Sequence, residues 1–136
     1  MKFLPVPVEY LDDKWQDIKP ILNKAVCLSP RKIDIEDVYT ASKQGAYLVW
    51  TVEEEEKVIA VVTTRMVFYP KGYAMALDFV GGGRMKEWIE LVLSTLETHA
   101  RHNKCIHMEG FGRKAWDRFI NKFGWYPAHI TYHKDL

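Results

Sequence analysis

The chain has 136 residues, which is room for one domain of ordinary size, so we expect a single domain over residues 1–136 and exclude two. A hydrophobic content of 48% with 13% aromatic residues predicts a buried core and excludes a disordered chain. The 19 Lys and Arg against 18 Asp and Glu leave a net charge of +1, which excludes a strong electrostatic attraction to nucleic acid or an anionic membrane. From Arg84 onward there are nine Lys and Arg and six Asp and Glu, so this part is mildly basic.

The cysteines and the N-terminus predict a soluble protein of the cytoplasm. Cys27 and Cys105 lie far apart without close ligand spacing, so we interpret both as reduced core thiols. Pro5 and Pro7 interrupt the N-terminal residues, which lack the apolar core of a signal peptide. No stretch approaches the ~20 apolar residues that a membrane span needs.

The first part of the chain predicts two helices. Apolar residues spaced by three and four indicate a helix with Asp12 or Asp13 as its N-cap that extends to Val26. Pro20 either kinks this helix or restarts it, because proline lacks the N–H for the preceding turn. Ser29-Pro30 marks a break, and a second helix is expected over 34–42, capped by Asp34 and stopped near Gly45.

The middle of the chain predicts an antiparallel meander of three strands. β-branched and aromatic residues indicate strands over 47–52, 58–69 and 73–80. The turn between the last two is Pro70-Lys71-Gly72. The acidic run Glu53 to Glu56 predicts a solvated hairpin tip, the alternative being a metal or partner site.

The second half predicts alternating helices and strands after the glycines 81–83. The fourth strand is expected to pair in parallel with the third, because a helix connects them. The expected elements are a helix from Met85 to Ala100 ended by Asn103 and Lys104, a strand from Cys105 to Met108, a helix from Lys114 to Lys122 capped by Gly124, and a last strand from Ala128 to His133.

This layout resembles the GNAT acyltransferase fold. The resemblance implies an α/β (α+β) protein whose central mixed, mostly antiparallel sheet is flanked by helices in the order β-α-α-β-β-β-α-β-α-β. The stretch from Trp116 to Trp125 resembles the family's closing motif, in which a helix ends in Lys-hydrophobic-Gly-aromatic. The element Gly112-Arg113-Lys114-Ala115-Trp116-Asp117-Arg118 resembles one found in small GNAT-like proteins of tailed bacteriophages, some of which are virion or morphogenesis components.

The resemblance also implies a site for acetyl-CoA as co-substrate. A helix N-terminus binds phosphate through unpaired N–H groups and a positive dipole, and glycines permit close approach. The alternative is a bare strand-to-helix turn, since the loop is shorter than in the family. The expected cofactor-binding residues are Val80, Gly81, Gly82, Gly83, Arg84 and Arg113.

The expected catalytic residues are Asp78 and Tyr126. Asp78 is the ionisable group of an apolar strand, where burial would raise its pKa toward that of a useful base, the alternative being a surface-facing Asp. The family's tyrosine acid is replaced by Ile120, so Tyr126, Tyr132 or a water substitutes, or such chemistry is absent.

The histidines do not predict a metal site. His99, His102 and His107 lack a carboxylate at a known ligand spacing, and His107 is interpreted as a partly buried, hydrogen-bonded imidazole. Trp88 and Trp116 are interpreted as core residues.

Two functions follow from the resemblance. The first is a phage-type, acetyl-CoA-dependent N-acetyltransferase that acts on the amine of a protein or small molecule. The second is a non-catalytic GNAT-fold virion, morphogenesis or host-interaction protein with a phage or host partner. The first is favoured by the glycines and the basic helix start, and the second by Ile120 and the short loop. Either places a phage-encoded protein in the host cytoplasm or the virion, without nucleic acid or membrane as a partner.

Overall fold

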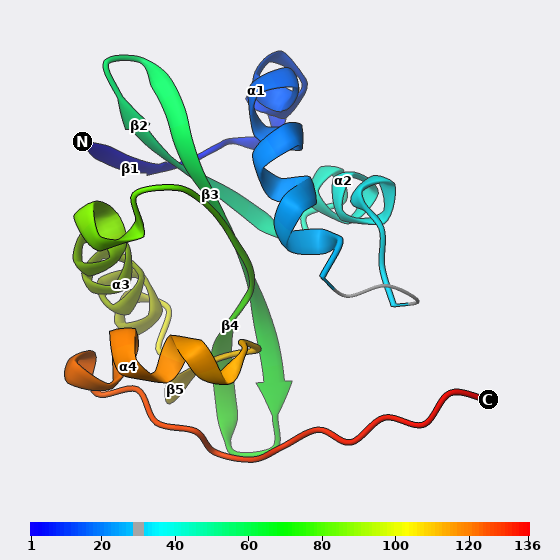
Figure 1. Ribbon diagram of the computed structural model, residues 1–136, viewed down its shortest axis with the longest axis vertical. Helices are drawn as coiled ribbons and strands as arrows, with labels where there is room; N and C mark the ends of the chain where they lie inside the picture. The colour runs from blue at the N-terminus through cyan, green and yellow to red at the C-terminus, as the bar shows by residue number, and fades with distance from the viewer. Residues whose placement is uncertain (29–31) are drawn as a thin grey trace.

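The computed structural model describes residues 1–28 and 32–136, which form a single five-stranded sheet with helices on both faces (Figure 1). The strands follow the order β1-β2-β3-β4-β5, antiparallel except for the parallel pair β4 and β5. This confirms the predicted fold class and the parallel crossover. The elements are β1 (Lys2–Pro5), α1 (Val8–Val26), α2 (Ile35–Lys43), β2 (Leu48–Glu54), β3 (Lys57–Tyr69), β4 (Gly72–Gly82), α3 (Met85–His102), β5 (His107–Gly110) and α4 (Asp117–Ile120), the last flanked by 3-10 turns Lys114–Trp116 and Asn121–Phe123.

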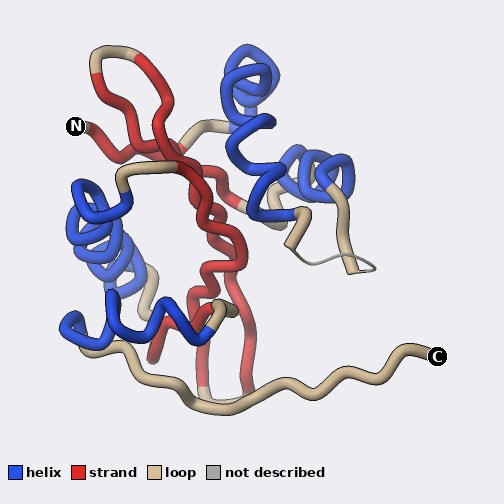
Figure 2. Tube along the Cα trace, viewed as in Figure 1, coloured by secondary structure: helices blue, strands red, loops and turns tan. Residues whose placement is uncertain are grey.

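Each face of the sheet carries its own hydrophobic cluster. Helix α3 buries Trp88 and Leu96 against one face, and α1 and α2 bury Ile18, Leu22 and Val38 against the other. Figure 2 shows the sheet between these two groups of helices. The alternation of apolar side chains along β2 and β3 supplies both clusters, since successive residues point to opposite faces.

In the first two helices, the difference from expectation lies at the start of α1. It begins at Val8, directly after Pro7, and not after Asp12 or Asp13. Pro20 neither restarts nor ends it, because buried residues on both sides of the proline hold one continuous helix against the sheet. Helix α2 is confirmed, with Asp34 as N-cap in a reciprocal capping box. The expected break at Ser29-Pro30 lies outside the described residues.

The meander is confirmed, although two boundaries move. Only Glu55 and Glu56 form the tip between β2 and β3, where both have positive φ, because Glu53 and Glu54 continue the strand pairing. The fourth predicted strand lies two residues later than expected, at His107–Gly110. Cys27 is exposed, so its assignment to the core is wrong, whereas Cys105 is half-buried and Trp88 is a core residue as predicted.

The C-terminal part contains the largest error of the sequence prediction. The expected helix over 114–122 is divided into three short turns, which end at Gly124 with φ +90°. Residues 125–136, all of them described, contain no strand, so the strand predicted over 128–133 is wrong. The alternation of apolar residues there indicates two faces, but Ile130 and Tyr132 are exposed and the segment pairs with no strand. No described helix is long and apolar enough to cross a bilayer.

Candidate functional site

The site begins where β4 and β5 separate. β4 pairs with β3 along its length to Gly82, but with β5 only as far as Leu77 opposite Gly110. Asp78 is the extra residue of a β-bulge, because Thr63 pairs with Phe79 and the next residue of β3 pairs with Leu77. Among the described residues, no strand therefore covers the β5 side of β4 from Asp78 to Gly82, and this edge is open to an extended ligand.

The glycines after this edge have separate roles. Gly81 and Gly82 belong to β4, which corrects their assignment to a loop. A Cβ at Gly81 would lie 2.8 Å from the Ile21 carbonyl oxygen of α1, and one at Gly82 would lie 2.5 Å from that of Ile59. The neighbouring backbone thus leaves no room for a side chain at Gly81 or Gly82. A Cβ at Gly83 meets no described atom within 4 Å, so of these three glycines only Gly83 has room for a side chain.

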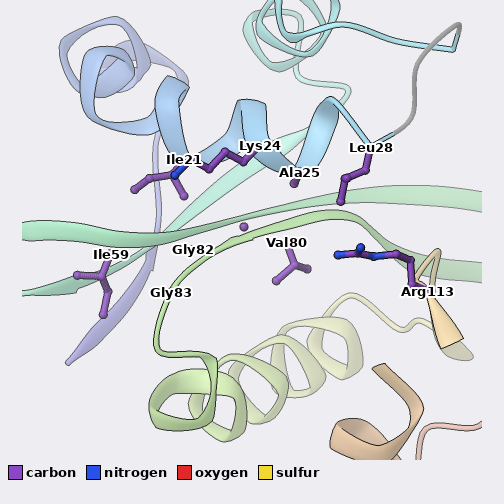
Figure 3. Close-up of a pocket in the computed structure, with 10 residues that line it drawn as sticks. Ile21, Lys24, Ala25, Leu28, Ile59, Val80, Gly82, Gly83 and Arg113 are labelled. Atoms are coloured by element: carbon purple, nitrogen blue, oxygen red, sulfur yellow. The ribbon is translucent and has the colours of Figure 1, made fainter. Parts of the chain in front are cut away.

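A groove of about 420 Å³ lies over these glycines (Figure 3). Val80 and Gly81 to Gly83 line it from β4 and the following turn, and Ile21, Lys24, Ala25 and Leu28 line it from the α1 side. Arg113 reaches it from the segment after β5, which places this predicted residue beside Val80. The described lining contains two cations, Lys24 and Arg113, and no carboxylate, which is the charge balance that a diphosphate requires. Lys24 was missed because a lone lysine near a helix end is an ordinary surface residue.

Arg84 does not point its charge into this groove. Its guanidinium donates to Glu87 at 2.6 Å and to Glu54 at 2.9 Å, and these two carboxylates hold its pKa above the usual range. Arg84 has φ +60° as the residue before α3, and no side chain caps the helix. The Arg84 side chain is therefore paired with two carboxylates and not free for the predicted phosphate contact. The backbone N–H groups at the start of α3 have no side-chain cap, so they can still bind an anion.

Asp78 is paired with an arginine across the strands. Arg65 Nε and Nη2 donate to its two carboxylate oxygens at 2.6 and 3.1 Å, and the Asp78 side chain is 9% exposed. Asp78 is therefore a largely buried carboxylate with a cationic partner, not a surface-facing one. Hydrogen bonding to Asp78 also holds the pKa of Arg65 above its usual value. The catalytic role predicted for Asp78 stays a prediction.

The predicted tyrosine lies apart from the groove. Tyr126 is 80% exposed on the C-terminal segment and is not among the described residues that line the groove. Ile120, at the family's tyrosine position, is half-buried against the cluster that contains α3. Neither residue brings a proton donor to the β4 edge in this arrangement.

A second polar group, missed at the sequence level, lies on the α1 side of the sheet. The Tyr69 hydroxyl donates to the two Glu109 oxygens at 2.8 and 3.0 Å, and His107 Nε2 lies 3.1 Å from Glu109 Oε1. The rings of Tyr69 and His107 stack with centroids 5.8 Å apart. The hydrogen bond to Glu109 raises the pKa of Tyr69 above its usual value. His107 is exposed, not partly buried as predicted; the alternating positions His107 and Glu109 were the signal available in the sequence.

The histidines within residues 1–28 and 32–136 are not assembled into a metal site. Among the described residues, no group of three His, Cys, Asp or Glu side chains is placed to hold a metal ion. His99 packs edge-on against Trp50, with ring centroids 5.1 Å apart, and burial lowers its pKa.

Comparison with known proteins identifies the fold. Ribosomal-protein-alanine N-acetyltransferase from Brucella melitensis biovar Abortus 2308 superposes with a TM-score of 0.75 at 10% identity, covering 100% of both chains. Glucosamine-6-phosphate N-acetyltransferase from Arabidopsis thaliana gives a TM-score of 0.71 at 17% identity, covering 98% of this chain and 97% of that one. A predicted acetyltransferase with acetyl-CoA from Clostridium acetobutylicum gives 0.71 at 13% identity, covering 98% and 95%. No protein-family model and no curated protein matches the sequence. The chain therefore has the fold of the GNAT acetyltransferases.

Proposed function

We propose that this protein is an acetyl-CoA-dependent N-acetyltransferase of the GNAT type. The observation that carries the proposal is the separation of β4 from β5 at the Asp78 bulge, which leaves a strand edge leading to Gly83 and the start of α3. An extended chain with amide groups can pair with a free strand edge, and a diphosphate can lie at a helix N-terminus. The amide-containing arm of coenzyme A would thus pair with the β4 edge, and its diphosphate would lie at the start of α3.

The side chains of the groove support the same placement. Lys24 and Arg113 would bind the diphosphate, together with the backbone of Gly83 and the first turn of α3. Bound acetyl-CoA supplies a thioester whose carbonyl carbon is open to attack by an amine. The likeness to a structure with acetyl-CoA supports this ligand, and the protein's own part is to orient it along β4.

A second candidate is a non-catalytic GNAT-fold protein of the kind that tailed bacteriophages encode for virion or host-interaction roles. It is favoured by Ile120, which cannot donate a proton to a leaving thiolate, and by the exposure of Tyr126 away from the groove. The resemblance of Gly112 to Arg118 to the phage proteins supports a phage source for either candidate.

Calorimetric titration with acetyl-CoA tests the enzyme candidate, because an acetyltransferase must bind its acyl donor. We expect saturable one-to-one binding by the native chain, weakened about tenfold by Lys24→Ala or Arg113→Ala, because each removes one charge-assisted contact with the diphosphate. Arg101→Ala is the matched control, since Arg101 is an exposed cation paired with Glu97 on α3, and it should bind as the native chain does. Absence of binding by the native chain would reject the enzyme and favour the second candidate, whereas an equal loss in the control would reject the assignment of Lys24 and Arg113 to the diphosphate.

A further inference from the structure

The Tyr69–His107–Glu109 cluster lies on a part of the sheet that the helices leave open. The cluster packed beneath α1 and α2 reaches Val49, Val61 and Phe79 but includes neither β5 nor the end of β3 that carries Tyr69. Figure 1 shows β5 at the opposite edge of the sheet from β1. Helices α3 and α4 pack on the face of the sheet opposite α1 and α2. The side chain of His107 is 48% exposed and that of Glu109 is 25% exposed. A ligand can therefore reach the cluster from solvent.

The charge of this face suits a cation. The charge of Arg65 also acts on Glu109, but Arg65 already donates two hydrogen bonds to Asp78. The opposite charges of Arg65 and Asp78 therefore neutralise each other. The hydrogen-bond partners of Glu109 among the described residues are a phenol and an imidazole, and no Lys or Arg side chain there forms an ion pair with it. The stacked rings of Tyr69 and His107 border the carboxylate, and aromatic faces attract organic cations.

The cluster also lies close to the proposed cofactor edge. Glu109 pairs in register with Ala76, and Asp78, where β4 leaves β5, is two residues further along the strand. Two residues of a strand span about 7 Å. Ala74 and Ala76, which stand opposite His107 and Glu109, are small, and this lets the Tyr69 side chain reach across β4 to Glu109.

We propose that this face binds the acceptor of the acyl group, with the Glu109 carboxylate holding a primary ammonium at the exposed edge of the stacked Tyr69 and His107 rings. The inference rests on the proposed function for the identity of the ligand as an acceptor, and it defines the substrate class as a cationic primary amine on a slender alkyl chain. The stacked rings would obstruct a broad acceptor, and the Glu109 carboxylate would repel an anionic one. Glu109 is then a binding residue, and Tyr69 positions its carboxylate.

Solution NMR at neutral pH tests the proposal with n-butylamine, which is an ammonium ion under these conditions, and with 1-butanol as its uncharged counterpart. We expect n-butylamine to move the His107 imidazole and Glu109 amide signals in a saturable manner, and 1-butanol to leave them unchanged. Glu109→Gln keeps a hydrogen-bond acceptor for Tyr69 and should weaken the amine about tenfold. Glu97→Gln, which removes an exposed carboxylate on α3, should have no effect on amine binding.

The outcomes separate this inference from the proposed function. Unmoved His107 signals, equal shifts with 1-butanol, or unchanged amine affinity in Glu109→Gln would overturn the acceptor site and leave the cluster as a link between β3 and β5. Titrating acetyl-CoA into the same samples reports on the cofactor site independently. Failure of acetyl-CoA to bind would overturn both the enzyme and the acceptor assignment, whereas binding of acetyl-CoA without any amine effect would overturn the acceptor site alone.

Discussion

Replacing Gly82 by alanine is expected to lower the free energy of unfolding by about 3 kcal/mol, whereas the same change at Gly83 should alter it by no more than about 0.5 kcal/mol. Gly82 has φ +127°, a conformation that side chains disfavour, and a Cβ there would lie 2.5 Å from the Ile59 oxygen and 2.6 Å from Ala60 Cα. Both obstacles are backbone atoms of the paired strand β3, which cannot move without breaking the pairing. Urea denaturation of the two variants measures the difference.

This contrast decides which glycine can test the cofactor site. A variant at Gly82 would lose acetyl-CoA binding through damage to the sheet, so its failure to bind would carry no information about the groove. Gly83 has open space at its Cβ position, and Gly83→Val should therefore fold while it crowds the diphosphate. Equal stability losses at the two positions would contradict the assignment of Gly82 to strand packing.

Asp78→Asn is expected to destabilise the fold by about 2 kcal/mol, because it leaves the Arg65 guanidinium without its anionic partner on a largely covered part of the sheet. The side chain of Asp78 is 9% exposed and that of Arg65 is 35% exposed, so solvent compensates only part of the loss. Glu97→Gln serves as the control, since that exposed ion pair on α3 should contribute less than about 1 kcal/mol.

A double-mutant cycle assigns the Asp78 effect to its partner. Arg65→Gln combined with Asp78→Asn should be less destabilising than the sum of the two single changes, because the double variant contains no unpaired charge. Additive losses would show that Asp78 does not act through Arg65. A loss of acetyl transfer in Asp78→Asn with unchanged stability would instead support the predicted role of Asp78 as the general base.

The periodic parts of the chain could be predicted from the sequence. Helix α3 follows from apolar residues spaced by three and four, and the capping box of α2 from Asp34 and Asp37. Both signals depend only on residues close in sequence, so they can be recognised without knowledge of the tertiary structure. The start of α1 could not be predicted, because it depends on packing of Leu11 against the sheet and not on a capping side chain.

The candidate site was predictable in position but not in its contacts. The glycines mark the end of β4 in the sequence, yet their division into two packing glycines and one open glycine depends on the approach of α1 and β3. Arg65 and Asp78 are the charged residues inside two adjacent strands, a signal that could have suggested their pairing. The tail could not be predicted, because alternation along 128–133 does not reveal whether a partner strand is present.

In the proposed complex, acetyl-CoA lies along the open edge of β4 and against the start of α3. Mapping backbone amide shifts of the native chain during a titration with acetyl-CoA tests this placement. We expect the largest changes at residues 78–85 and at Arg113, with little change in β1 and β2. Changes confined to other parts of the chain, or none at saturating acetyl-CoA, would contradict it.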